Sequence, residues 1–351
     1  MPTIDADAHV IENRATWAYL REHEYEFWPQ VYVRDSGDGA PDRRNQRNEY
    51  WVIDGNLLNK DGNVGKDVPP ESGTMEDIER RLAHMDELGI DIQVLYPSLF
   101  LRPLTKEPDA DFALARSYNR WLAEIWSHAK DRFRWVAVPP LLSLFHPDPV
   151  RKELQFCKEN GACGIFLRGI EHERLTNHRY FFPLYEIAEE LDMALCFHAG
   201  NNSFFYDEMF RPSGPVMAFK FPVIGAFCAL LQSGIPSRFP KTRWAFIEAS
   251  AQWLPYALGE VKLRLARQGQ RVSANELLAV SNFYVTTQWS DDLPWLLEQV
   301  GDGNILIGTD YGHRDTATEV EALRRLAADG SLSPASVDKI LSKNPAAAYG
   351  L

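Results

Sequence analysis

The sequence lacks the features that mark membrane, secreted or nucleic-acid-binding proteins. No apolar run reaches the roughly 18 residues of a membrane span. The N-terminus shows no charged segment followed by an apolar one, as a signal peptide would. Lysine and arginine do not cluster, and the net charge is -12. Binding to nucleic acid or to a membrane is therefore not expected.

Cysteine is also scarce, with four residues in 351. The four lie in apolar or helical surroundings and lack the spacing of metal ligands or of a disulfide framework. We expect buried, reduced thiols in a cytoplasmic protein, at Cys157, Cys163, Cys196 and Cys228.

No glycine-rich dinucleotide loop follows any expected strand, which disfavours a doubly wound sheet. Short apolar segments instead alternate with amphipathic helical ones, a pattern typical of parallel strands. Eight such units in roughly 310 residues predict an α/β protein with a (β/α)8 TIM-like barrel, in one domain over residues 1–351. The first expected strand ends at Asp7 to His9, and the others span 91–96, 133–138, 164–167, 194–197, 243–247, 282–286 and 304–308.

Residues 29–75 interrupt this regularity. The segment is rich in glycine, proline, asparagine and aspartate, and only residues 50–55 resemble one arm of a hairpin. A long irregular insertion is either a surface loop or a functional lid. Its aromatic residues favour a cap or lid over the barrel.

The N-terminal stretch carries Asp5, Asp7, His9 and Glu12 within eight residues. Side chains alternate along a strand, so the first three are expected on one face. Polar groups on one face of a buried strand are costly unless something binds them, and a divalent metal is the simplest candidate. Helix capping would explain one aspartate, but not the whole pattern.

Other expected strands also end in metal-binding residue types. His198 follows the fifth strand and Glu248 the sixth, while Asp310 and His313 follow the eighth. In a barrel these ends meet at one rim, where the chemistry of such folds takes place. Singly, His198 is equally compatible with a packed core histidine; together, these residues predict a metal centre.

These motifs resemble the amidohydrolase superfamily, in particular the amidohydrolase-2 branch that includes aminocarboxymuconate-semialdehyde decarboxylase. The resemblance spans nearly the whole chain and implies a (β/α)8 barrel with metal ligands at Asp7, His9, His198 and Asp310. One position departs from it, because Glu248 stands where relatives typically carry a histidine base or ligand. The fourth strand ends in Leu167 and Arg168, so no lysine is available there for a bridging carbamate.

The predicted ligands are more numerous than one ion requires, since one divalent ion takes about four to six. Some proteins resembling this branch are dinuclear oxygenases, and mixed histidine and carboxylate ligands suit iron or manganese. We therefore expect two divalent ions, Fe/Fe or Mn/Fe, in an O2-dependent monooxygenase of a small organic substrate. Glu248 is the expected bridge, and Glu248, Asp310 and His313 are the expected catalytic residues. The predicted metal ligands are Asp7, His9, Glu12, His198, Glu248, Asp310 and His313.

Two other functions stay open. One is a mononuclear zinc or manganese hydrolase or non-oxidative decarboxylase, in which the ion lowers the pKa of a bound water. The other is an inactive barrel kept as a partner subunit, which the intact ligands argue against.

Three further residues are candidates for substrate binding. Arg168 could clamp a carboxylate or pair with an acid at the rim. Phe204 and Tyr206 belong to an aromatic run that walls a pocket or an oligomer interface. We expect a homo-oligomer, a dimer or a tetramer, with a hetero-oligomer of related chains as the alternative.

Overall fold

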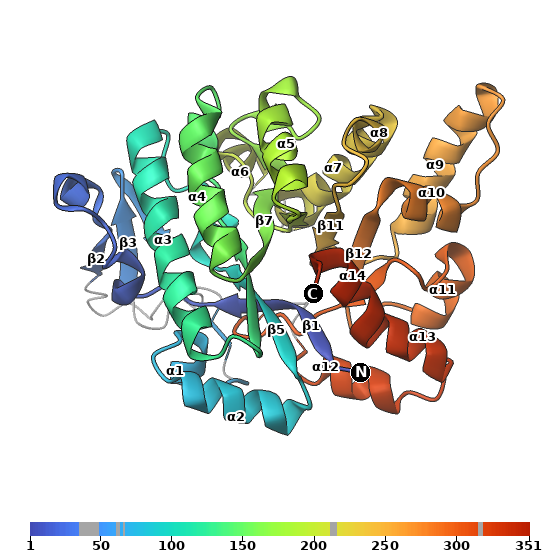
Figure 1. Ribbon diagram of the computed structural model, residues 1–351, viewed down its shortest axis with the longest axis horizontal. Coiled ribbons are helices and arrows are strands. Elements are labelled where there is room, and N and C mark those ends of the chain that lie inside the picture. The colour runs from blue at the N-terminus through green and yellow to red at the C-terminus, as the bar shows by residue number, and fades with distance from the viewer. Residues whose placement is uncertain (35–48, 61–63, 66, 211–215, 315–318) are drawn as a thin grey trace.

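The computed structural model describes residues 1–34, 49–60, 64–65, 67–210, 216–314 and 319–351. At its centre is an eight-stranded sheet in which every described strand pair is parallel (Figure 1). This confirms the predicted (β/α)8 fold. In sheet order the strands are β1 (Ile4–Val10), β5 (Ile92–Pro97), β6 (Phe133–Ala137), β7 (Ala162–Arg168), β10 (Ala194–His198), β11 (Trp244–Ile247), β12 (Phe283–Thr287) and β13 (Ile305–Ile307).

The barrel closes where the segment after β13 meets β1. The amide of Asp310 donates to the carbonyl of Asp7 at 2.9 Å, and the amide of His9 donates to the carbonyl of Tyr311 at 2.8 Å. Closure therefore brings together residues about 300 positions apart in the chain.

The helices surround the strands because each has one apolar face. In α2, Asp77 caps the N-terminus by accepting from the amide of Arg80, and Gly89 ends the helix in the left-handed region at φ 71°. The larger helices are α2 (Ile78–Leu88), α3 (Pro108–His128), α4 (Pro147–Glu159), α5 (Phe182–Glu190), α7 (Phe221–Gln232), α9 (Leu254–Arg267), α10 (Ala274–Ser281) and α11 (Leu293–Val300). The shorter ones are α1 (Pro70–Gly73), α6 (Phe204–Phe210), α8 (Ile235–Arg238), α12 (Ala322–Ala328), α13 (Pro334–Asp338) and α14 (Asn344–Tyr349).

The described parts of residues 29–75 include a small antiparallel sheet of β2 (Gln30–Val33), β3 (Glu49–Ile53) and β4 (Asn56–Asn59). Its Trp51 is fully buried. Further along, Val64 pairs with His313, and the amide of Gly65 donates to the carbonyl of Gly312 at 2.8 Å. The segment thus reaches the end of the eighth barrel strand. Residues 35–48, 61–63 and 66 lie outside the described residues, and the lid function remains a prediction.

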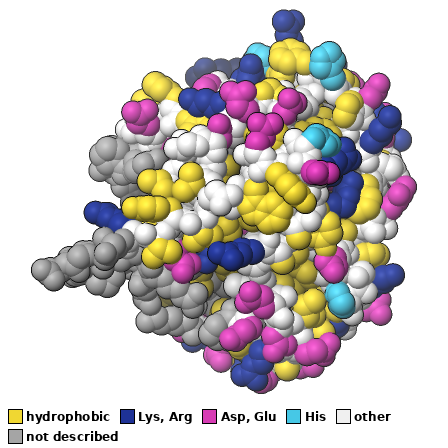
Figure 2. All heavy atoms as spheres, turned by 90° about the vertical axis from the view of Figure 1, so that its left-hand side faces the viewer, with side chains coloured by type: hydrophobic (Ala, Val, Ile, Leu, Met, Phe, Trp, Pro, Cys, Tyr) yellow, Lys and Arg dark blue, Asp and Glu magenta, His cyan; other side chains and the backbone are white. Residues whose placement is uncertain are grey.

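All four cysteines are free, and Cys157, Cys163 and Cys196 are buried as expected, whereas Cys228 is only partly buried. Every helix in the described ranges is too short or too polar to span a lipid bilayer. On the face shown in Figure 2, basic and acidic side chains are interspersed with hydrophobic ones.

Gly308 lies at the closure of the barrel, and no side chain fits there. A Cβ at this position would lie 2.3 Å from the Cβ of Asp7 and 2.8 Å from its amide nitrogen. We expect Gly308→Ala to lower the free energy of unfolding by about 1–3 kcal/mol, because the added methyl group must displace β1. Chemical denaturation would measure this.

Gly303→Ala is the matched control, since a Cβ there would meet only the Oδ1 of Asn275, at 3.8 Å. Equal stability of the two variants would contradict the close packing of Gly308 against Asp7.

Candidate metal centre

Strand β1 delivers Asp7 and His9 to the carboxyl-terminal rim of the barrel. Its pairing with β5 shifts register between Asp5 and Ala8, so simple alternation fails there. Asp5 faces the neighbouring segments instead and accepts from the amide of Thr309 at 2.9 Å and from its hydroxyl at 2.6 Å. Asp5 therefore joins the two ends of the barrel, while Asp7 and His9 share a contact of 3.4 Å.

The hydrogen bonds of His9 and His198 fix which ring nitrogen faces the centre. Nδ1 of His9 lies 3.0 Å from the carbonyl of Pro97, and Nδ1 of His198 lies 2.7 Å from the carbonyl of Ala199. A carbonyl only accepts, so both Nδ1 atoms carry the hydrogen and both Nε2 atoms present a lone pair. Donation of Nδ1–H to a backbone carbonyl is how metal-binding histidines are usually oriented.

The two lone pairs point at the same carboxylate oxygen. Oδ1 of Asp7 lies 3.4 Å from Nε2 of His9 and 3.2 Å from Nε2 of His198. Three electron-rich atoms this close repel one another unless a cation or a proton lies among them. Nε2 of His9 also has no hydrogen-bond partner among the described residues.

Asp310 and His313 complete the centre from the end of β13. Oδ1 of Asp310 lies 3.3 Å from Nε2 of His9 and 2.9 Å from Nδ1 of His313. Nε2 of His313 lies 2.7 Å from the hydroxyl of Ser98, which itself donates to the carbonyl of Val10. The Ser98 hydroxyl must therefore accept from Nε2–H of His313, which turns Nδ1 toward Asp310.

These separations fit ligands around one ion. Ligands at about 2.0–2.1 Å from a tetrahedral ion lie about 3.3 Å from each other. The Nε2–Oδ1 separations that join Asp7, His9, His198 and Asp310 are 3.2–3.4 Å. These four residues, all fully or nearly buried, come from the ends of β1, β10 and β13. They are the four that the family resemblance implied, and they suit a divalent metal.

The protonation states also favour a cation. Burial lowers the pKa of His9 to about 3, and the nearby His313 lowers it further, so the His9 imidazole is neutral. Burial alone would raise the pKa of Asp7, but at low pH positive charge on the neighbouring His198 and His9 outweighs burial and holds the pKa below its usual range, and a metal ion between them would act in the same direction. A neutral imidazole, as at His9, and an ionised carboxylate, as at Asp7, are the forms that bind metal.

Two acidic residues at the rim have backbone conformations that are rare outside glycine. The φ angle is 52° at Asp310 and 61° at Glu248. Such strain of about 1–3 kcal/mol persists only where surrounding contacts impose it, and it is common at functional sites. At Asp310 the imposing contact is the hydrogen bond of its amide to Asp7.

The structure does not bring Glu12 into the centre. Its two carboxylate oxygens accept from the amides of Ser98 and Leu99, at 3.1 and 2.8 Å. They bind the turn after β5, neither cluster of potential ligands among the described residues includes Glu12, and burial raises its pKa to about 7.

The geometry also does not place Glu248 between two ions. Its Oε2 lies 3.5 Å from Nδ1 of His198, the ring nitrogen that faces away from Asp7. The described residues contain two clusters of potential ligands. One consists of Asp7, His9 and His198, and the other of His9, Asp310 and His313; Glu248 belongs to neither.

A cavity of about 20 Å³, room for about one water molecule, lies near the same rim, and none of the four candidate ligands lines it. It lies among the turn after β5, the ends of β6 and β7, and the start of α3. Phe166 lines it and lies between it and the centre, with its ring 6.2 Å from that of His198. The wall is largely apolar, with polar groups at Arg102, Thr105, Asp111, Arg168, Glu171 and His172.

Arg168 lines this cavity, but its guanidinium is already engaged. Nε lies 3.1 Å from both oxygens of Glu171, Nη2 also donates to Glu171, and Nη1 donates to the carbonyl of Phe100 at 3.2 Å. This ion pair with an acid at the rim is the alternative that the sequence analysis gave for Arg168.

Phe204 and Tyr206 lie on α6, where the hydroxyl of Tyr206 donates to the carbonyl of Met217. Neither residue is among the described residues that line the cavity.

Ser98, which contacts His313, and Asp111, which lines the cavity, are candidate site residues that the sequence analysis missed. Ser98 follows β5 directly, so its position at a strand end was a usable signal. Asp111 lies inside a helix and carries no such signal. Burial raises the pKa of Asp111 to about 7, so its carboxyl can donate as well as accept near neutral pH.

Comparisons with known proteins agree with this picture. The family model of amidohydrolases matches residues 4–351. No curated protein matches the chain. Solved structures under 25% identical to the chain share its fold, and the descriptions of the three reported next name no oxygenase.

One is an amidohydrolase from Mycobacterium avium subsp. paratuberculosis K-10, with 19% identity, 100% of this chain and 98% of that chain covered, and a TM-score of 0.79. Another is 4-oxalomesaconate hydratase from Rhodopseudomonas palustris, with 18% identity, 99% and 95% covered, and a TM-score of 0.66. The third is a dihydroxybenzoic acid decarboxylase from Polaromonas sp. JS666, solved with manganese and the inhibitor 2-nitroresorcinol, with 20% identity, 100% and 97% covered, and a TM-score of 0.65. The expected iron-dependent monooxygenase therefore finds no support, and the hydrolase or decarboxylase alternative fits better.

Metal binding should depend on both ends of the chain. We expect His9→Ala and Asp310→Ala each to lose bound manganese while keeping the circular dichroism of a folded barrel, because each removes one ligand of a shared centre. Elemental analysis after dialysis against manganese would measure this. His146→Ala changes an exposed histidine and is the control. Full metal content in either ligand variant would refute the assignment.

Proposed function

The chain belongs to the amidohydrolase family, and we propose that it is a mononuclear, metal-dependent decarboxylase of a small carboxylic acid that acts without O2. The observation that carries this proposal is the convergence of two imidazole lone pairs and two carboxylates at one point of the barrel rim. The proposed ion is manganese or zinc.

A single ion is favoured over two because both clusters of potential ligands share His9. Its Nδ1 donates to the carbonyl of Pro97, so only Nε2 can bind metal. One nitrogen lone pair binds one ion, and the two clusters therefore describe one centre. The position of Glu248, beside the outward nitrogen of His198, supports a role in orienting that ring rather than in bridging two ions.

The proposed reaction needs a group that stabilises the developing negative charge on the substrate, and it also needs a proton. A divalent ion in this position would supply Lewis acidity toward a substrate oxygen. Loss of CO2 leaves the bonding electron pair on the substrate carbon, and that carbon must then take a proton. Asp310 and His313, 2.9 Å apart and buried, form a pair that can hold this proton.

A small, flat substrate would have to enter by widening the cavity at the ends of β6 and β7, whose volume is only about 20 Å³. Phe100, Leu114, Val138 and Phe166 line it with apolar surface. Arg168 and Glu171 neutralise each other there, while the Asp111 carboxyl can exchange hydrogen bonds with a substrate hydroxyl. This composition suits an aromatic or unsaturated acid with hydroxyl groups, and the substrate carboxylate would face the metal.

The test combines metal counting with product analysis. We expect one manganese per chain in reconstituted protein, and CO2 release without O2 consumption from at least one acid in a panel of hydroxybenzoates and dihydroxybenzoates. Mass spectrometry of the metal content, a CO2 assay and an oxygen electrode would measure these. Two ions per chain with O2 uptake would restore the monooxygenase. Cleavage of amide or ester substrates without CO2 release would indicate a hydrolase.

Filling the cavity should separate substrate binding from metal binding. Val138 is buried at the end of β6 and lines the cavity. We expect Val138→Phe to raise KM at least about tenfold, because the added ring fills the cavity that the substrate would have to widen, with manganese content unchanged. Val280→Phe, on the exposed face of α10, is the control for the added ring. An unchanged KM in Val138→Phe would place the substrate elsewhere.

A further inference from the structure

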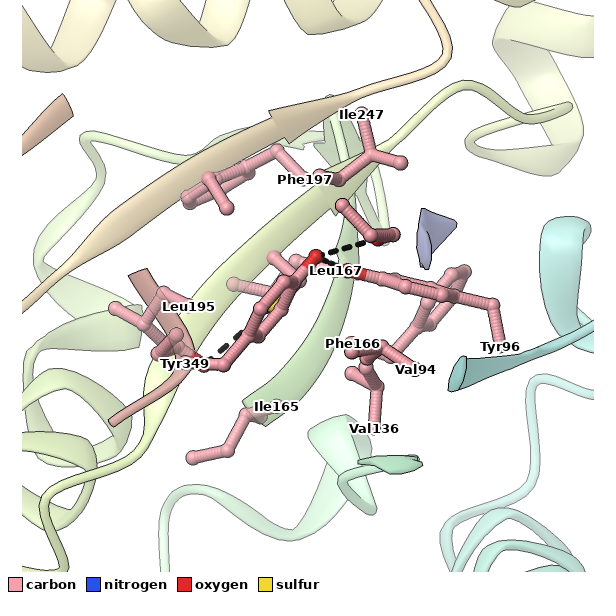
Figure 3. Packing of buried hydrophobic residues seen from close by; sticks show 14 of the residues in the cluster. Val94, Tyr96, Val136, Ile165, Phe166, Leu167, Leu195, Phe197, Ile247 and Tyr349 are labelled. Carbon is pink, nitrogen blue, oxygen red and sulfur yellow. Dashed lines mark hydrogen bonds between the residues drawn. The ribbon is translucent and has the colours of Figure 1, made fainter. Parts of the chain in front are cut away.

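Tyr349 lies on helix α14, near the C-terminal end of the chain, and reaches into the interior of the barrel. Figure 3 shows it among packed hydrophobic side chains of the barrel strands, joined to Tyr96 by a hydrogen bond. Both tyrosines are fully buried. A buried hydroxyl must find a partner, so the contacts of this pair show what it holds in place.

The first contact is with the irregular part of β1. The hydroxyl of Tyr349 donates to the carbonyl of Ala6 at 2.7 Å. Ala6 directly precedes Asp7 and lies within the register shift between Asp5 and Ala8. A bulge re-aims side chains, and its geometry depends on the groups that bind its backbone.

The second contact runs to the imidazoles of the centre. Tyr349 has one hydroxyl hydrogen, which goes to Ala6, so Tyr96 must donate to Tyr349 across their 2.7 Å separation. The ring of Tyr96 lies 5.1 Å from that of His198 and 6.1 Å from that of His9. Burial raises the pKa of both tyrosines well above the usual value, so both hydroxyls keep their hydrogens.

Tyr96 is also tied to His9 through the backbone. The two residues are register partners between β1 and β5, and the next residue, Pro97, supplies the carbonyl that orients Nδ1 of His9. A displacement of Tyr96 would therefore change both the packing and the orientation of a ligand.

We propose that Tyr349 is a positioning residue for the metal centre, acting through the carbonyl of Ala6 on Asp7 and through Tyr96 on His9 and His198. It touches neither metal nor substrate. The inference rests on the proposed metal centre, but not on the proposed reaction.

Tyr349→Phe tests this by removing one hydroxyl and keeping the ring. The matched control is Tyr185→Phe, because Tyr185 is also fully buried and its hydroxyl also donates to a backbone carbonyl, that of Thr176. Both variants should lose thermal stability to a similar degree without metal. Only Tyr349→Phe should bind manganese more weakly, by about 5- to 10-fold, as expected for a residue that orients ligands. Competition with a chelator would measure the affinity, and the electron paramagnetic resonance of bound manganese would report the ligand geometry.

Tyr96→Phe gives a second measurement. It keeps the ring against His9 and His198 but removes the hydrogen donated to Tyr349, so it should weaken manganese binding as well, and the double variant should lose less than the two single losses combined. Manganese affinity equal to wild type in Tyr349→Phe, or an equal loss in Tyr185→Phe, would overturn the inference and leave the metal centre intact. Absence of manganese binding in the wild type would overturn both, whereas failure to release CO2 would affect only the proposed reaction.

Discussion

Closure between β1 and the segment after β13 is the constraint on which the centre depends. Two backbone hydrogen bonds join Asp310 to Asp7 and Tyr311 to His9, so ligands from the two ends of the chain have fixed positions. Asp5 strengthens the same junction through Thr309. Gly308 permits it, because only a residue without a Cβ can pass so close to Asp7. The function of the site therefore depends on a contact that exists only when the whole barrel has formed.

A buried network supports this junction from behind. Arg81, which is fully buried, donates to the carbonyl of His9 at 2.8 Å and to the side chain of Gln93 at 2.9 Å. Gln93 in turn donates to Asp5 at 3.1 Å. Removing one member of such a network leaves its partner buried and unpaired, so each is costly to change. We infer that these residues hold the backbone at Asp7 and His9 and do not take part in the chemistry.

The sequence predicted the eight strands and the candidate ligands that the structure brings together at their ends, because both depend on local patterns. His198 and Asp310 directly follow apolar strands, and parallel strands of a barrel end at one rim. Asp5 and Glu12 were less predictable. Period-two alternation grouped Asp5 with Asp7, but the register shift in β1 separates them. Glu12 binds two amides of a turn that lies 86 and 87 positions away, a contact that no local pattern contains.

The expectation of two ions arose from counting carboxylates, and counting cannot tell which of them meet. Tertiary contacts occupy Asp5 and Glu12, and Glu248 faces the outward nitrogen of His198. The remaining potential ligands surround Nε2 of His9, and the other ring nitrogen of His9 donates to the carbonyl of Pro97. In the proposed mononuclear centre, the tautomer of His9 would limit the number of ions, rather than the supply of acids. Pro97 follows Tyr96, the register partner of His9. Because its carbonyl fixes the tautomer of His9, Pro97 has a more direct effect on the centre than the nearby carboxylates of Asp5 and Glu12, which bind the backbone elsewhere.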